Sequence, residues 1–130
     1  MPAQLASTQP VTVFVAARHD RVRSALWSLL AAEPGIRPVA ATADFGDLMR
    51  LLGSVSPAVV VADEAVFGYA DTRRLRELAQ VAPRLVVVGM QDHPGFVSRA
   101  REAGAADYVR LDEPERLAEA VLEAGTAREP

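Results

Sequence analysis

The sequence of 130 residues contains no cysteine and no lysine, so all 14 of its basic residues are arginines. Without cysteine, disulfide bonds, thiol nucleophiles and cysteine-ligated metal sites are excluded. Without lysine, every mechanism that depends on a lysine side chain is excluded as well. No apolar stretch approaches the roughly 18 residues of a membrane-spanning helix, and the amino-terminal residues lack the features of a signal peptide. We therefore predict a cytoplasmic protein with no membrane-inserted part.

Several motifs of enzymes and cofactor-binding proteins are also missing. No Gly-x-Ser-x-Gly motif is present to expose a nucleophilic serine, and no glycine-rich loop follows a predicted strand to hold a phosphate group. The net charge is -3, and no basic cluster is longer than Arg73-Arg74-x-Arg76, so the chain has no general attraction for nucleic acid. These absences predict a protein that is not an enzyme, has no cofactor and does not bind nucleic acid directly.

Apolar and β-branched stretches alternate along the chain with segments of helical periodicity. Helical spacing of apolar residues, capping residues and breaks at proline or glycine predict five helices. The strands are predicted at residues 11–16, 36–41, 59–63, 85–88 and 107–110. The helices are predicted at residues 20–33, 45–55, 72–82 and 96–103 and from residue 114 onward, with Asp20, Asp44 and Thr72 as N-caps. Residues 11–125 then form one domain, preceded by a flexible arm at 1–10 and followed by a tail at 126–130.

Five strand-helix units with short connections predict a single five-stranded parallel sheet covered by helices on both faces. Right-handed crossovers favour the doubly wound strand order 2-1-3-4-5. Pro38 is expected at a sheet edge or strand start, because proline cannot donate to a ladder. In such a sheet the loops after strands one, three and four surround one crevice. Asp63 ends the apolar third strand at this crevice.

A family resemblance follows from these residues. Residues 16–30 (Ala-Ala-Arg-His-Asp-Arg-Val-Arg-Ser-Ala-Leu-Trp-Ser-Leu-Leu), residues 58–68 and Gly104-Ala-Ala-Asp-Tyr-Val resemble the CheY-like receiver domain of two-component response regulators. The resemblance implies that a histidine kinase passes a phosphoryl group to the aspartate after strand three. It also implies an acidic pair that holds magnesium, a Ser or Thr after strand four, a lysine after strand five and a switch aromatic.

The sequence departs from this pattern at most of the supporting positions. Asp63 stands at the phosphoacceptor position and Tyr108 at that of the switch aromatic. Ala17 and Arg18 stand in place of the acidic pair. Gly89 stands in place of the hydroxyl residue, and Leu111 in place of the lysine. We therefore predict a degenerate site that binds no metal and leaves Asp63 unphosphorylated. Asp63 is then expected either to pair with Arg18 or to cap the turn after its strand through backbone amides.

The preferred hypothesis is an atypical receiver that acts as a phosphorylation-independent signalling, protein-interaction or dimerisation module. The resemblance suggests an interface with an effector domain or a second copy on the face of the fourth helix, fifth strand and fifth helix. That face is predicted to contain Arg99, Glu102, Tyr108, Arg110, Arg116, Glu119 and Glu123.

Three alternatives remain open at this stage. The first is a working receiver that accepts phosphate at Asp63. The second is an amino-terminal regulatory domain of a longer protein, such as a pilus-assembly or localisation ATPase or a transcription factor. The third is a ligand-binding domain of flavodoxin-like fold. A zinc site from His19 and His93 is disfavoured, because their spacing matches no ligand motif.

Overall fold

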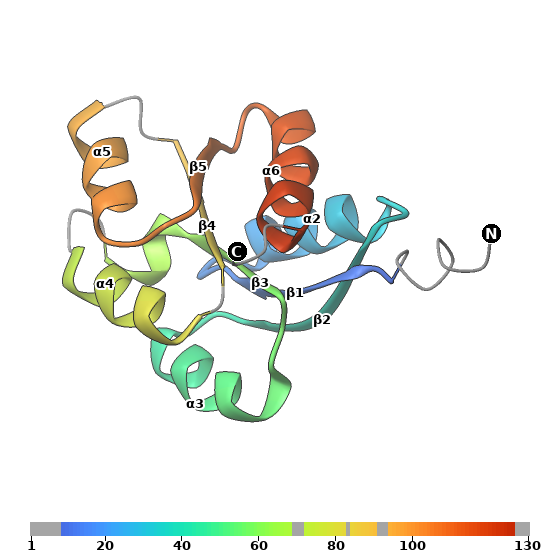
Figure 1. Cartoon of the computed structure of the whole chain (residues 1–130), viewed down its shortest axis with the longest axis horizontal. Coiled ribbons are helices and arrows are strands. Elements are labelled where there is room, and N and C mark those ends of the chain that lie inside the picture. Colours follow the sequence, from blue (N-terminus) through green and yellow to red (C-terminus); the bar gives the residue numbers. More distant parts are fainter. Residues whose placement is uncertain (1–8, 69–71, 83, 91–93, 127–130) are drawn as a thin grey trace.

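The computed structural model describes residues 9–68, 72–82, 84–90 and 94–126. Its sheet has five parallel strands in the order β2-β1-β3-β4-β5, which confirms the predicted topology (Figure 1). The strands are β1 (Val11–Ala16), β2 (Ile36–Thr42), β3 (Val59–Asp63), β4 (Leu85–Gly89) and β5 (Asp107–Arg110).

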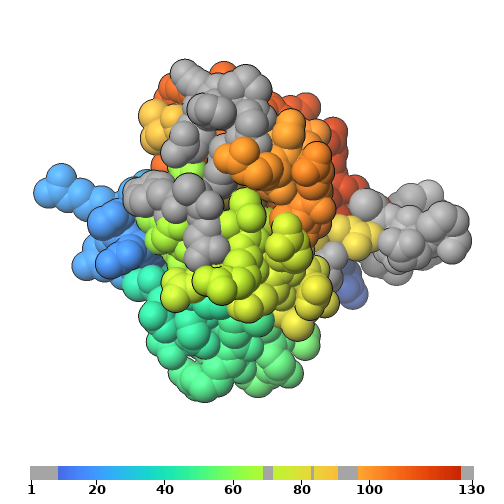
Figure 2. All heavy atoms as spheres, turned by 90° about the vertical axis from the view of Figure 1, so that its left-hand side faces the viewer, coloured from blue at the N-terminus to red at the C-terminus, as the bar shows by residue number. Residues whose placement is uncertain are grey.

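Helices cover both faces of the sheet. They are α2 (Asp20–Ala31), α3 (Phe45–Val55), α4 (Thr72–Val81), α5 (Pro94–Glu102) and α6 (Pro114–Thr126), and a 3-10 turn η1 (Glu64–Val66) follows β3. The helices α2 and α6 lie on one face, and α3, α4 and α5 lie on the other (Figure 1). On the second face α4 lies between α3 and α5 (Figure 2).

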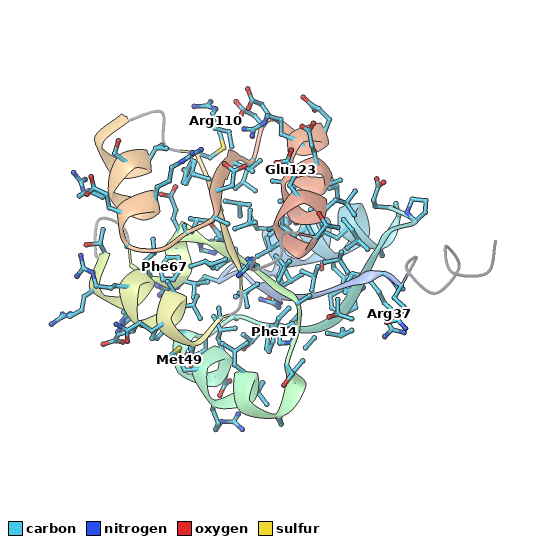
Figure 3. All side chains as sticks on the ribbon, in the orientation of Figure 1. Phe14, Arg37, Met49, Phe67, Arg110 and Glu123 are labelled. Carbon is cyan, nitrogen blue, oxygen red and sulfur yellow. The ribbon has the colours of Figure 1, made fainter. Side chains whose placement is uncertain are left out.

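The core consists of two apolar layers, one on each side of the sheet. Every residue of β3 and β4 is buried, because helices cover both faces and an apolar run without polar alternation is what such strands require. Phe14 and Phe67 contribute to the layer beneath α3, α4 and α5, and both point into the interior in Figure 3. Leu26, Leu30 and Leu117 contribute to the layer beneath α2 and α6. The carboxyl end of β3 is thereby fixed at the centre of the molecule.

The edge strand β2 is irregular, as its proline predicts. The register with β1 pairs Val13 with Pro38 and then Phe14 with Ala40, so Val39 is passed over. This irregularity coincides with the residue that has no N–H to donate. The strand is indeed at an edge of the sheet.

Several helix ends differ from the predicted ones. Helix α2 ends at Ala31 rather than at residue 33, and α5 spans Pro94–Glu102 rather than residues 96–103. His19 rather than Asp20 is the N-cap of α2, and Asp20 is the first helical residue. Helix α3 runs through Gly53 and ends at Val55, the predicted last residue, and its C-cap Ser56 adopts a left-handed conformation with φ of 51°. Helix α6 continues through Gly125 to Thr126. The predicted Asp44 cap of α3 is confirmed, since its side chain accepts from the Asp47 amide.

Candidate functional site

The candidate site lies where the carboxyl ends of four strands meet at one edge of the sheet. Ala16 is paired with Ala62, Asp63 with Val88, and Gly89 with Arg110. The residues that follow these strands therefore share one edge. The structure brings the predicted positions after strands one, three and four together there, as the doubly wound order requires.

Asp63 caps the turn that follows its own strand. Its side chain is in the N-cap position of η1 and accepts a hydrogen bond from the Ala65 amide at 3.5 Å. The residue is only 5% exposed. Burial raises the pKa of the Asp63 carboxyl above its ordinary value of 3.8, and this outweighs the lowering by the Ala65 amide and by the nearby charge of His19. The carboxylate is thus held by backbone amides, which is the second of the two predicted arrangements.

The predicted ion pair between Arg18 and Asp63 is absent from the described part of the chain, so that alternative was wrong. Arg18 is exposed and, with Asp44, Phe45 and Arg74, lines a hollow of about 380 Å³. Asp63 lies beneath the turn that it caps. The pair fails because an exposed arginine has no reason to lose its hydration for a carboxylate that the backbone already holds.

Ala17 offers no ligand atom where the resemblance places an acidic residue. Its side chain is fully buried. Its carbonyl oxygen accepts from Nη1 of Arg23 at 3.0 Å, a contact that the sequence did not suggest. Among the described residues no group of three or more His, Asp or Glu side chains could hold a metal ion. His93 and its neighbour Asp92 lie outside the described residues. Magnesium prefers oxygen ligands, so Ala17 and the cation of Arg18 do not fit a magnesium site.

Glu64 is a buried acid to which the sequence assigned no role. It is 4% exposed, and its Oε2 atom accepts from the Met90 amide at 3.1 Å and from the Tyr108 hydroxyl at 3.4 Å. A Cβ atom added to Gly89 would lie 2.2 Å from that same oxygen. The sequence did contain a signal for this contact. Glu64 is an acid next to Asp63, and Gly89, on the adjacent strand, has no side chain to block it.

The residues at the lysine and aromatic positions both point away from solvent. Leu111 is half-buried beside α2 and α6 and lines an apolar groove of about 340 Å³ with residues that include Leu26, Leu29 and Leu117. Tyr108 is 5% exposed and belongs to the apolar layer beneath α3, α4 and α5. Its predicted place on an exposed interface was wrong, because the ring faces the core and its hydroxyl reaches Glu64.

The other residues of the predicted interface fall into two groups. Arg99, Glu102, Glu119 and Glu123 are exposed. Arg110 and Arg116 are engaged within the chain, by Asp112 at 2.7 Å and by Asp107 at 3.5 Å. Arg110 is on β5 and Glu123 is on α6, and both lie toward the outside of the molecule (Figure 3). The charges available to a partner are therefore fewer than the sequence suggested.

Comparisons with known proteins agree with this fold. No protein-family model matches the chain. The response regulator GacA of Pseudomonas aeruginosa is 32% identical over 76% of this chain and 47% of its own length. The transcriptional regulatory protein DesR of Bacillus subtilis is 26% identical over 85% of this chain and 56% of its own. This chain spans about half the length of these curated relatives.

A solved structure supports the same relationship. The two-component response regulator of the LuxR family from Aurantimonas is 28% identical and superimposes with a TM-score of 0.82 over 93% of this chain and 89% of its own. No helix in the described residues is both long and apolar enough to cross a membrane. With the strand order, the aspartate after β3 and the tyrosine on β5 in place, the chain is a CheY-like receiver domain of the response-regulator family.

Proposed function

We propose that this receiver domain signals by contact with a protein partner, without phosphorylation of Asp63. One observation carries the proposal: the end of β1 presents Ala17 and Arg18, so no carboxylate stands there beside Asp63. Phosphoryl transfer depends on neutralising the charge that develops on the transferred group, and a magnesium ion contributes several kcal/mol to this. Ala17 and Arg18 do not supply the ligands that such an ion needs.

The surroundings of Asp63 support the same conclusion. The carboxyl is buried, and burial raises its pKa, so its charged form is disfavoured compared with that of an exposed aspartate. Gly89 has no hydroxyl to offer a phosphoryl oxygen, and Leu111 brings an apolar side chain to the position of the lysine. Three separate loops would have to change before phosphate could be accommodated.

The expected partner is an effector domain or a second copy of this chain. Exposed charges of both signs on α5 and α6 suit reciprocal contacts across a two-fold axis. The relatives are a response regulator and a transcriptional regulatory protein, which supports a regulatory contact rather than catalysis as the output of this domain. The proposal includes no direct contact with nucleic acid or membrane, and a cytoplasmic location remains a prediction of the sequence.

The proposal is tested by phosphotransfer to the purified chain. The protein is incubated with acetyl phosphate and magnesium, and the intact mass is measured beside Asp63→Asn as the acceptor-negative control. We expect no phosphoryl adduct on the unaltered chain. Ala17→Asp combined with Arg18→Asp restores the acidic pair and is expected to increase binding of beryllofluoride in magnesium. A stoichiometric adduct that Asp63→Asn abolishes would overturn the proposal in favour of the phosphoacceptor alternative.

The second alternative, a regulatory domain of a longer protein, is compatible with either result. Its supporting observation is that the curated relatives are about twice as long as the segment that this chain matches. In that context the free surface of α5 and α6 would contact the remainder of the same polypeptide. Fusion of an output domain and measurement of its activity with and without the receiver would test this arrangement.

A further inference from the structure

The buried carboxylate of Glu64 requires compensation that the structure supplies from two other strands. Moving a carboxylate out of water is costly unless hydrogen bonds replace those to water. Glu64 follows β3, its amide donor Met90 follows β4, and its hydroxyl donor Tyr108 belongs to β5. Hydrogen bonds to a charged acceptor are stronger than those between neutral groups. One side chain therefore connects the ends of three neighbouring strands.

The space that this carboxylate occupies exists only because residue 89 is glycine. A Cβ atom at Gly89 would lie 2.2 Å from Oε2 and 2.5 Å from Cδ of Glu64, and 2.6 Å from the Tyr108 hydroxyl. These distances are far below van der Waals contact, so a serine or threonine at this position cannot coexist with the observed Glu64. Gly89 stands where the receiver resemblance places the hydroxyl donor. Glu64 thus fills the volume of the missing side chain.

We propose that the carboxyl group of Glu64 occupies the receiver pocket, and that it holds Tyr108 in the inward position without any bound phosphate. This inference rests on the proposed function, since a pocket that accepted phosphate would have to release Glu64 first. Beyond the proposed function, the inference gives the pocket a role of its own, which is to fix the position of Tyr108. The protein's own carboxyl group occupies this volume at the ends of β4 and β5, and the Tyr108 hydroxyl is bonded to it.

Tyr108 is the group through which Glu64 acts. Its ring belongs to the layer beneath α5, and β5 is an edge strand. An edge strand has solvent beside it, so a tyrosine released by Glu64 can turn outward with no rearrangement of the sheet. The hydrogen bond to Glu64 favours the inward position. Glu64 is accordingly a positioning residue, because it acts through Tyr108 and touches no substrate.

The experiment follows Tyr108 directly. Tyr108 and Tyr69 are the two tyrosines of the sequence, so Tyr69→Phe leaves one tyrosine to label with 3-fluorotyrosine. In this background Glu64→Ala is expected to move the fluorine resonance toward that of an exposed tyrosine. It should also raise the rate of nitration by tetranitromethane about tenfold, since the inward position loses its hydrogen-bond acceptor. Glu64→Gln retains an acceptor oxygen and should give an intermediate rate.

The control is Glu77→Gln, which neutralises an exposed glutamate on α4 and should leave the resonance and the nitration rate unchanged. Gly89→Ala provides a second variant, because the added methyl group displaces both the carboxyl group and the Tyr108 hydroxyl and should release Tyr108 as Glu64→Ala does. Each variant is first shown to be folded by circular dichroism.

Two results separate this inference from the proposed function. If folded Glu64→Ala and Gly89→Ala both keep Tyr108 shielded, with nitration within about twofold of the parent rate, Glu64 does not position Tyr108. The phosphotransfer result for Asp63 is then unaffected. If Asp63 of the unaltered chain accepts phosphate while Tyr108 responds to Glu64 as described, the proposed function fails and the positioning role of Glu64 stands.

Discussion

At the scale of single residues, Asp63 is an acid whose burial weakens the folded state at neutral pH. Its folded-state pKa is raised from 3.8 by burial, so the folded protein binds a proton more readily than the unfolded chain does. For such a group the contribution to stability is fully present below pH 3.8 and is lost as the pH rises through the higher folded-state value. At pH 7 the charged, buried carboxylate therefore costs stability.

Asp63→Asn is accordingly expected to stabilise the domain at pH 7. The amide oxygen of asparagine can still accept from the Ala65 amide, while the buried charge is removed. We expect a gain on the order of 1 kcal/mol in the free energy of unfolding, measured by urea denaturation. The gain should shrink as the pH is lowered toward 3.8.

Asp112→Asn is the control of opposite sign. Asp112 is exposed, and its hydrogen bond with Arg110 lowers the pKa of its carboxyl, so its contribution is present at neutral pH and lost as the pH falls. Removing this charge should lower the melting temperature slightly at pH 7. A melting temperature for Asp63→Asn below that of the unaltered protein at pH 7, with no dependence on pH, would contradict the account of Asp63.

The sequence predicted correctly which residues lie at the site edge of the sheet. It did not predict the directions in which their side chains point. The order of the strands places Ala17, Asp63 and Gly89 at one edge, and this follows from chain connectivity alone. The role of Glu64 depends on an inward rotamer that exists only because Gly89 leaves space for it. Such a contact joins strands 26 residues apart in the chain. No local pattern in the sequence encodes it.

At the scale of elements, the strands were easier to predict than the ends of the helices. The buried strands β3 and β4 are apolar runs bounded by turn residues, and their limits differ from the prediction by no more than one residue. Helix ends depend on weaker local preferences. The tail was expected to begin at residue 126, yet α6 continues through Gly125 to Thr126. Packing of the helix against the sheet outweighs the preference of one glycine.

Two glycines inside helices predict opposite effects of the same substitution. A Cβ atom at Gly53 meets nothing within 4 Å, whereas one at Gly125 would lie 2.4 Å from Cγ1 of Val11, where α6 packs on β1. Gly53→Ala should therefore stabilise the domain by about 0.5–1 kcal/mol through helix propensity. Gly125→Ala should destabilise it by about 1–3 kcal/mol through overpacking. Urea denaturation of both variants, each compared with the unaltered chain, measures the two signs.

The pair also tests how closely α6 approaches the sheet. If Gly125→Ala is as stable as the unaltered chain, the last turn of α6 does not contact Val11 as closely as the structure places it. If Gly53→Ala is destabilising, the space around Gly53 is not open to a methyl group, and the gain expected from helix propensity is lost. Either result contradicts the corresponding half of the prediction.

At the scale of the whole molecule, connectivity and burial determine the fold, while the surface decides the partner. Strand order follows from short right-handed crossovers, which is why the topology could be predicted from one sequence. The proposed interface could be predicted only as a face, because ion pairs within the chain compete for the charges on it. Asp107 forms ion pairs with both Arg101 and Arg116. Neither of these two arginines is therefore fully available to a partner.

The last prediction concerns self-association through the exposed charges of α5 and α6. We expect a homodimer in which Arg99 and the acids Glu119 and Glu123 face a second copy. Arg99→Glu should then raise the dimer dissociation constant about tenfold, as the loss of one favourable charge contact and the gain of a repulsive one imply. Sedimentation velocity over a range of concentrations measures it. Dimer formation should also weaken at high salt, because contacts between exposed charges are screened.

The matched control is Arg37→Glu, which makes the same change of charge on β2, at the opposite edge of the sheet from β5, and Arg37 points outward there (Figure 3). It alters the net charge as much as Arg99→Glu does, so any general effect of charge on association appears equally in both variants. Equal weakening by the two substitutions would place the contact elsewhere, and a monomer at every concentration would exclude the dimer. Selective weakening by Arg99→Glu would locate the contact on α5, beside the strand whose tyrosine Glu64 holds inward, and would connect the state of the pocket to the surface that a partner contacts.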